Sequence, residues 1–475
     1  MNDDLAPSYV EPAESGGLIS RMDNNAMPDN SEGNSIGSKR VGFLFWEGYL
    51  GVAPSLINAT RVLASAGYEV DIITRRTSSD YAQLPRFPDT VRIYFEQSAV
   101  KAEDAPGSSY QAKEHHWAGS VWRAVVPYVC RRVFRDIRER YMIILELKQF
   151  VTFGLACMHS REYVAVVGID MLGLIAATGI ALRRRTPVIY WSLELAFLKE
   201  FTHWPLRLLK RLERLCNRRA AFTIIQDTDR AESLVFENSL KPGKIILVPN
   251  GPLGLPLRQG SDFFQRKFKL AERKLLLHIG LISHLMYSLE IAKETANWPE
   301  DWALVFHERA KRDMINDIYL RTIAAVGGRK VFLSLDPVAY DDLNSVVASA
   351  QIGLVFYRDD LGPNLAQIAG ASGKMGQYLR CGLPVICSDL PGLRMIIEKY
   401  RCGVCVKEFK DIEGAVKKIF EDYGVYRSNA FRCYEEVYEF GVHFKKVMAK
   451  IHEFSGQKEA ISMQTSMYEG PSERG

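Results

Sequence analysis

The stretch Ala371–Gly392, ASGKMGQYLRCGLPVICSDLPG, contains residues whose types and spacing suit the binding of an anion. The pattern predicts a helix that begins at Gly373 and ends at Gly382, followed by a buried strand at Pro384–Cys387. The first N–H groups of such a helix, its dipole and the ammonium group of Lys374 all attract negative charge. The stretch therefore predicts a phosphate-binding site.

This predicted site is not a Walker A loop. The position five before Gly373 is Ile368 rather than glycine, and Met375 follows the lysine where serine or threonine would hold magnesium. We expect the bare backbone N–H groups of the loop 369–373 to bind the anion without such a metal ligand.

The composition is that of a globular protein with room for two or three domains. The 475 residues are 47% hydrophobic and 25% charged, and a net charge of +5 is small for this length, so we expect no dedicated nucleic-acid binder. Eight scattered cysteines suit reduced thiols, and the N-terminus lacks the pattern of a secretory signal. These features favour a cytoplasmic protein, with a disordered tail at 1–38.

The elements that would position a site alternate as strand and helix. Val41–Trp46, a helix from Pro54 and a second strand ending at Thr74 predict a β-α-β opening. Gly48 and Gly51 follow the first strand, but they lack the GxGxxG spacing, and no acidic residue closes the second strand. A nicotinamide-dependent oxidoreductase is therefore disfavoured.

The apolar run Val164–Leu182 is long enough to span a membrane, but it contains Asp170, and a carboxylate in mid-bilayer is costly. We therefore predict a buried strand, a turn, and a helix from Met171 to about Arg183. Asp170 would then lie at the carboxyl end of a strand, where open α/β sheets bind ligands. The alternative is that Asp170 caps the helix.

Two basic stretches bear on membrane contact. Pro205–Arg219 predicts an amphipathic helix with Leu208, Leu212 and Leu215 along one stripe among arginines. We expect these leucines to pack against the sheet, while the arginines could face an anionic inner membrane surface. The stretch 117–141 could likewise dock on anionic lipid, but a solvated helix surface is favoured there.

The stretch from Lys374 to Gly392, KMGQYLRCGLPVICSDLPG, resembles the donor-nucleotide segment of GT-B glycosyltransferases, especially the retaining family 4, also called glycosyl transferases group 1. The resemblance implies an α/β GT-B fold, with two Rossmann-like domains whose parallel sheets face across a cleft. The expected boundaries are 39–252 for the acceptor-side domain, 253–425 for the nucleotide-sugar domain, 426–454 for a helix that packs back on the first domain, and 455–475 for a flexible tail.

The resemblance and the patterns above assign roles to residues on both sides of the expected cleft. The predicted donor-binding residues are Ser283, His284, Ser334, Asn364, Ser372, Gly373, Lys374 and Gln377. The predicted acceptor-side residues are Gly48, Gly51 and Glu194, and the predicted catalytic residues are Lys374, Arg309 and Asp170. Arg309 has an alternative role as a solvated residue at a helix start, and Glu194 has one as an ion-pair member. The resemblance implies no metal ion and no other cofactor. The nucleotide diphosphate-sugar is a co-substrate.

The sequence departs from the family at sites that matter for catalysis. Gln377 and Ala369 replace the family's paired glutamates, and Ile169 occupies a position where family members carry histidine. The Arg/Lys pair that neutralises the donor diphosphate is absent from the loop 281–288. Two functions therefore stay open. One is retaining, metal-independent transfer of a sugar to a glycan, glycolipid or polysaccharide precursor; the other is a catalytically impaired GT-B protein that binds nucleotide or glycan as a partner subunit.

Overall fold

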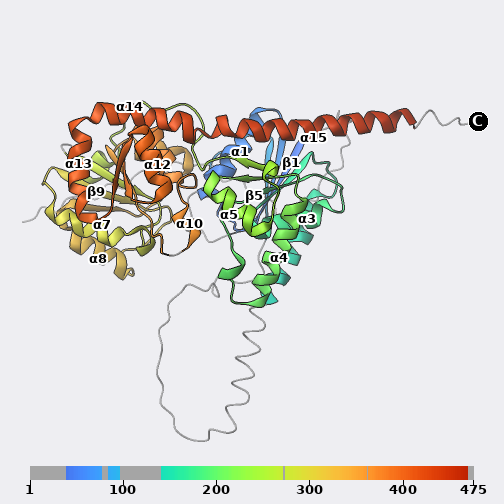
Figure 1. Ribbon diagram of the computed structural model, residues 1–475, viewed down its shortest axis with the longest axis horizontal. Coiled ribbons are helices and arrows are strands. Elements are labelled where there is room, and N and C mark those ends of the chain that lie inside the picture. The colour runs from blue at the N-terminus through green and yellow to red at the C-terminus, as the bar shows by residue number, and fades with distance from the viewer. Residues whose placement is uncertain (1–38, 77–83, 97–140, 271–272, 361, 469–475) are drawn as a thin grey trace, which may run out of the picture. The chain divides into compact units, whose positions relative to one another are not determined.

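The computed structural model describes residues 39–76, 84–96, 141–270, 273–360 and 362–468 (Figure 1). The expected tail at 1–38 and nearly all of the basic stretch 117–141 lie outside the described residues. The described chain contains two parallel sheets, each covered by helices.

The first sheet has the strand order β3-β2-β1-β4-β5-β6-β7, and all neighbouring strands are parallel. Its strands are β1 (Arg40–Phe45), β2 (Glu69–Arg75), β3 (Val91–Glu96), β4 (Ala165–Ile169), β5 (Val188–Trp191), β6 (Phe222–Ile225) and β7 (Ile245–Leu247). The α-helices are α1 (Pro54–Ser65), α3 (Asp170–Ala181), α4 (Trp204–Arg219) and α5 (Thr228–Asn238), together with a helix described over Tyr141–Met158. Short 3-10 helices are η1 (Leu50–Val52), η3 (Leu198–Glu200) and η4 (Pro242–Lys244). The strand order reverses between β1 and β4, as in a Rossmann fold.

The second sheet repeats this topology, with the order β10-β9-β8-β11-β12-β13. Its strands are β8 (Lys274–Ile279), β9 (Trp302–His307), β10 (Val331–Ser334), β11 (Ile352–Val355), β12 (Val385–Ser388) and β13 (Gly403–Val406). Its α-helices are α6 (Phe263–Phe268), α7 (Ser288–Glu294), α8 (Ile318–Gly327), α9 (Leu343–Val347), α10 (Pro363–Ala366), α11 (Gly373–Arg380), α12 (Pro391–Tyr400), α13 (Ile412–Glu421) and α14 (Tyr423–Cys433). The 3-10 helices are η5 (His284–Met286), η6 (Thr295–Asn297), η7 (Gly328–Lys330), η8 (Tyr340–Asp342) and η9 (Phe409–Asp411), and η10 (Tyr434–Tyr438) is a π-helix that leads to α15 (Phe440–Tyr468). The predicted α/β class with two Rossmann-like sheets is confirmed.

The central strands are buried because helices cover both faces of each sheet. All residues of β1 and β4 are buried, as expected for parallel strands with an apolar run. Gly168 in β4 permits a close approach of α3, since an added Cβ would lie 2.4 Å from the Cα of Leu174. The helix therefore begins immediately after the strand, at Asp170.

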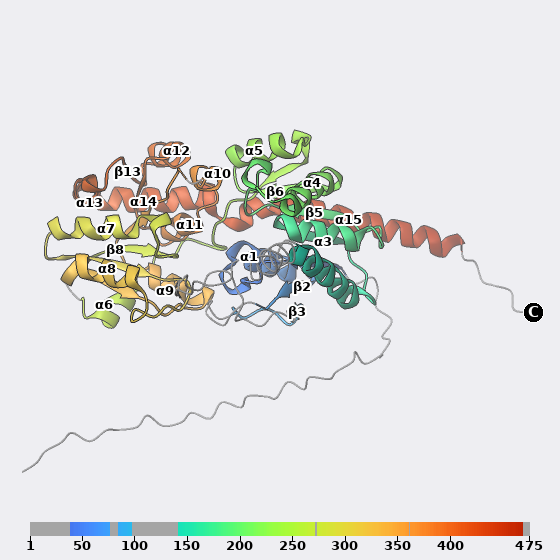
Figure 2. The ribbon, with the colours of Figure 1, turned by 90° about the horizontal axis from the view of Figure 1, so that it is seen from below.

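The last helix, α15, lies along the first half of the chain in both views (Figure 1, Figure 2). Its residues Phe440 and Phe444 stack on Trp191 of β5, with ring centroids 6.3 and 5.9 Å away. Tyr434 and Tyr438, just before α15, belong instead to the core of the second half. The helix runs on to Tyr468, so the tail expected at 455–475 begins as helix.

Helix α4 does not have the expected orientation. Leu208, Leu212 and Leu215 are exposed, whereas Lys210 and Glu213 are fully buried. The prediction that these leucines pack against the sheet is therefore wrong, because a buried ion pair occupies the face of α4 that meets the rest of the domain.

Candidate functional site

The candidate site consists of charged and aromatic side chains that follow the carboxyl ends of strands in both sheets. They are Glu47, Tyr49, Asp170 and Glu194 from the first half and Arg309, Tyr357 and Lys374 from the second half. Their charges act on one another: Arg309 influences the titration of Tyr49, Glu194, Tyr357 and Lys374. The two halves therefore bring acids and cations to one place, where open α/β sheets hold their ligands.

Lys374 lies in the first turn of α11 and is a partly buried cation. Its Nζ lies 4.6 Å from the ring centroid of Tyr357 and 3.5 Å from the sulfur of Met286. Within the described residues it forms no ion pair with a carboxylate. Burial, followed by the charge of Arg309, lowers the pKa of Lys374 to about 7. An anion bound beside this amine would favour its charged form and so raise the pKa of Lys374 again.

Ser372 fixes the start of α11. Its Oγ accepts a hydrogen bond from the N–H of Met375 at 3.4 Å and lies 2.8 Å from the hydroxyl of Tyr357, which follows β11. The N-cap therefore attaches the lysine-bearing turn to the neighbouring strand. Ser372 acts here as a positioning residue, and its predicted contact with the donor stays a prediction.

The loop 369–373 differs from the expectation of bare N–H groups. The N–H of Gly370 donates to Oδ2 of Asp227 at 2.9 Å, and the N–H groups of Ala371 and Gly373 donate to the carbonyl groups of Ile368 and Ala371. Gly373 therefore keeps its place at the helix start, but these three backbone donors are already bonded. The predicted anion site therefore depends mainly on the side chain of Lys374, and its role as an anion-binding group stays a prediction.

Arg309 follows β9 and is exposed. It adjoins Glu308, a fully buried residue whose carboxylate pairs with Arg312 at 3.0 Å and accepts the N–H of Ile282 at 2.9 Å. Because Arg312 already neutralises Glu308, the guanidinium of Arg309 is available to a ligand. The site thus holds two cations, Arg309 and Lys374, although the loop 281–288 lacks the expected Arg/Lys pair.

Asp170 starts α3 with a left-handed backbone, at φ +53°. Its Oδ1 accepts hydrogen bonds from the N–H groups of Leu193 at 2.7 Å and Glu194 at 2.8 Å, in the loop after β5. Burial raises the pKa of Asp170 well above its usual range, and the charges of Glu47 and Glu194 raise it further. Asp170 therefore holds the turn that carries Glu194, whose own pKa is raised by burial.

Glu47 was missed by the sequence analysis. It follows β1, the strand next to the central β4, and its Oε2 is buried without a hydrogen-bond partner among the described residues. Burial raises the pKa of Glu47 to about 7, and the charge of Glu194 contributes, while Arg75 opposes the shift. Its position as the first acidic residue after a central strand at the switch point was a signal that could have identified it.

Several predicted donor-binding side chains are already bonded to the protein. The amide of Asn364 accepts from the N–H of Leu195 and donates to its carbonyl, both at 2.8 Å, and it also accepts from Arg230 at 3.0 Å. Gln377 donates to Asn344 at 2.7 Å. Asn364 thus joins the two halves of the chain, and the donor roles of both amides stay predictions.

The remaining predicted residues are dispersed around the site. Ser334 is buried, and its Oγ lies 3.0 Å from Lys267 and 2.9 Å from His307. Ser283 has a buried Oγ with no partner among the described residues, and the exposed His284 follows it.

On the first half, Gly48 has φ +78° and Gly51 lies in η1, both directly beyond β1 and Glu47. Within the described part of the chain, no group of three or more histidine, cysteine or acidic residues is arranged to hold a metal.

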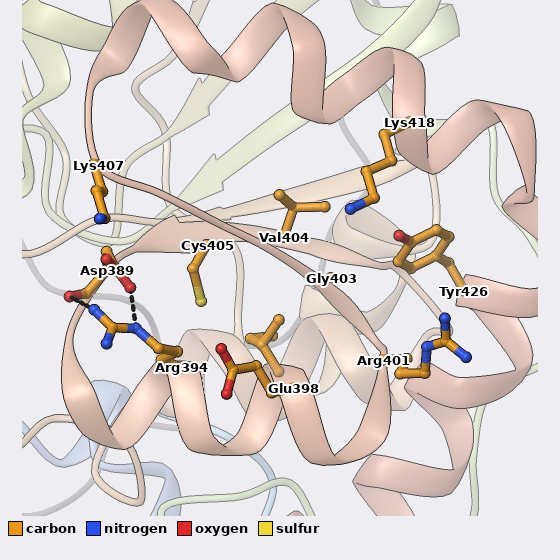
Figure 3. Close-up of a pocket in the computed structure, with 11 residues that line it drawn as sticks. Asp389, Arg394, Glu398, Arg401, Gly403, Val404, Cys405, Lys407, Lys418 and Tyr426 are labelled. Atoms are coloured by element: carbon orange, nitrogen blue, oxygen red, sulfur yellow. Dashed lines mark hydrogen bonds and ion pairs between the residues drawn. The ribbon is translucent and has the colours of Figure 1, made fainter.

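A separate pocket of about 620 Å³ lies beside β13, between α12 and α13 (Figure 3). Asp389 and Arg394 face each other there and form an ion pair. Cys405 also lines it, with its Sγ 3.4 Å from that of Cys387. None of the predicted site residues lines this pocket, so it is distinct from the candidate site.

Comparison with protein-family models matches residues 51–251 to the glycosyl transferase 4-like domain and residues 335–451 to the glucosyltransferase 3-like, C-terminal domain. Comparison with curated proteins finds no match.

Solved structures of similar fold cover nearly the whole chain. Sucrose-phosphate synthase from Thermosynechococcus elongatus has a TM-score of 0.59 and 15% identity, over 89% of this chain and 100% of that chain. Anabaena HepE in complex with UDP-glucose has a TM-score of 0.57 and 12% identity, over 87% of this chain and 99% of that chain. An α,α-trehalose-phosphate synthase (UDP-forming) from Burkholderia vietnamiensis has a TM-score of 0.53 and 10% identity, over 88% of this chain and 100% of that chain. At these identities the similarity shows the fold, which is GT-B. The two domain models match different parts of the chain, and together with the shared fold they support a GT-B glycosyltransferase of the family 4, or group 1, type.

Proposed function

We propose that the protein transfers a sugar from a uridine diphosphate-sugar to a hydroxyl group of a glycan, glycolipid or polysaccharide precursor, with retention of configuration and without a metal ion. The observation that carries the proposal is the convergence of Arg309 and Lys374 beside the acids of the first half. Uridine diphosphate is chosen because HepE was solved with UDP-glucose and the trehalose-phosphate synthase is named as UDP-forming.

The proposed chemistry follows from where charge develops. The bond between the anomeric carbon and the β-phosphate oxygen breaks, so the departing diphosphate gains negative charge, which Arg309 and Lys374 stabilise in place of a metal. The acceptor oxygen attacks from the same face, which retains the configuration. Its proton passes to the departing phosphate oxygen, while ionised Glu47 accepts a hydrogen bond from a neighbouring hydroxyl group of the acceptor and so orients the acceptor.

The test is release of UDP from a panel of UDP-sugars, in the presence of EDTA and of lipid-linked or oligosaccharide acceptors. We expect Lys374→Ala and Arg309→Ala to lower turnover by about 100-fold or more. Lys311→Ala removes an exposed cation two residues after Arg309 and is the matched control, with turnover unchanged. The configuration of the product is read by NMR.

Two results would overturn the proposal. UDP binding without turnover of any donor would support the binding-subunit alternative. Turnover that EDTA abolishes would refute the metal-independent mechanism. The acceptor is further proposed to lie at the cytoplasmic face of an anionic membrane.

A further inference from the structure

Helix α4 carries an apolar stripe that faces solvent. Trp204, Leu208, Leu212 and Leu215 are 48%, 40%, 36% and 45% exposed. Their spacing of four, four and three residues places them on one face of the helix. Single exposed leucines are ordinary, but a contiguous row of large apolar side chains marks a contact surface.

The outward orientation of this stripe is fixed by the opposite face of α4. Lys210 and Glu213 are buried there as an ion pair, and Glu213 also accepts hydrogen bonds from Tyr190 of β5 at 2.9 Å and from Asn238 of α5 at 3.1 Å. Rotating the helix to bury the leucines would move this pair to solvent and leave the buried polar groups of Tyr190 and Asn238 without their partner, which is unfavourable. Helix α4 therefore packs on the domain through its buried ion pair, and its leucines face solvent.

The apolar surface continues onto the helix Tyr141–Met158. The ring of Tyr141 meets that of Trp204 edge-on, with centroids 5.4 Å apart, and Tyr141 and Leu145 are 46% and 52% exposed. Among the described residues this helix alone is long and apolar enough to span a membrane, by length and composition only. We call Trp204, Leu208, Leu212, Leu215, Tyr141 and Leu145 the leucine face.

Arginines border the leucine face. Arg211 lies next to Leu212, and Arg219 lies one turn beyond Leu215; both are exposed and neither forms an ion pair with any residue that the structure describes. A membrane-surface helix combines aromatic and leucine side chains with flanking arginines, because the apolar groups enter the acyl boundary and the guanidinium groups meet anionic headgroups.

We propose that the leucine face docks the protein on an anionic lipid bilayer. The inference deepens the proposed function, since it supplies the surface on which a lipid-borne acceptor would be presented. The segment 195–203, which contains η3, joins Glu194 of the candidate site directly to Trp204 of the leucine face. A protein bound through α4 therefore holds its acceptor-side acids near the bilayer.

The test is co-sedimentation of the full chain with vesicles of phosphatidylcholine alone and with about 30% phosphatidylglycerol. We expect binding to the anionic vesicles that weakens with added salt. Arg211→Glu with Arg219→Glu should reduce the partition coefficient by roughly thirtyfold or more, at about fivefold for each basic residue lost. Leu208→Glu with Leu212→Glu should abolish binding, whereas Leu255→Glu, at an exposed leucine of the second half, should not change it.

Three outcomes would overturn the inference. Binding that is equal on neutral and anionic vesicles, or unaffected by the leucine variants, would exclude this face. A dimer in light scattering that the Leu208→Glu, Leu212→Glu variant dissociates would assign the face to a second copy of the chain. A fall in melting temperature without any vesicle binding would assign it to another segment of this chain. UDP release with a soluble acceptor is measured in parallel, so a failure of docking is distinguished from a failure of transfer.

Discussion

The lowered pKa of Lys374 gives a quantitative expectation for donor binding. In the free protein burial lowers this pKa to about 7, whereas an ammonium in contact with a diphosphate has its pKa raised. Donor binding above pH 7 must therefore take up a proton, and the affinity must fall as the pH rises. If the pKa in the complex lies above 9, the dissociation constant increases by about twentyfold between pH 6.5 and 8.5.

Titration calorimetry with UDP-glucose measures this linkage directly. The diphosphate diester of UDP-glucose keeps its charge over this range, so proton uptake reports the protein. Experiments in buffers of different ionisation enthalpy should give an uptake of about half a proton at pH 7 and close to one at pH 8.5. Lys374→Arg keeps the cation but does not titrate, so it should bind with no uptake and with little dependence on pH.

Glu47 also titrates near pH 7 and needs its own control. Glu47→Gln should retain the proton uptake and its pH dependence, since the group that binds the diphosphate is unchanged. If wild-type affinity is flat from pH 6.5 to 8.5, or if Lys374→Arg shows the same uptake as wild type, Lys374 is not the group that receives the diphosphate.

Two further expectations concern the acids and the contact between the halves. Glu47→Gln should lower kcat by about 10²-fold or more at pH 7 without changing the donor affinity. Because Glu47 acts as a carboxylate above its pKa of about 7, kcat of the wild type should rise with pH through this value, and the variant should lose that rise. A pH-rate profile in which the variant keeps the wild-type kcat would exclude this role. Gly370→Ala should destabilise the protein by about 1–3 kcal/mol, because the added Cβ would lie 2.7 Å from Oδ2 of Asp227. Thermal melting tests this against Gly414→Ala, in the open part of α13, where no loss is expected; equal melting temperatures of the two variants would contradict the argument.

The sequence predicted the helix that carries Lys374 and the strand that follows this helix, because their signals are local. The helix expected at Gly373 is α11, which begins at that residue, and the strand expected at Pro384–Cys387 is β12 at Val385–Ser388. Small residues before a helix, glycine after it and an apolar run are properties of neighbouring residues, so they can be read without the fold. The parallel α/β class likewise follows from alternating strands and helices, whereas the two Rossmann-like domains were expected from the family resemblance.

The errors arise where a partner far along the chain decides the outcome. The leucines of α4 match the period of a core-facing stripe, but Tyr190 and Asn238 provide hydrogen bonds that bury Glu213 instead. Three N–H groups of the loop 369–373 are bonded, because Asp227 and the carbonyl groups of Ile368 and Ala371 reach them. Glu47 gains its significance only when β1 and β5 bring it beside Glu194.

Helix α15 has a consequence for biosynthesis. Phe440, Phe444, Val447 and Ile451 belong to the same core as β1, β4 and β5, although some two hundred residues separate them from the last strand of that sheet. During translation this part of the apolar core is not covered by α15 until Ile451 has emerged from the ribosome. The core of the first Rossmann unit therefore stays incompletely buried while the second unit is synthesised. We expect a nascent chain that is arrested before α15 to bind chaperones, because its apolar core is exposed.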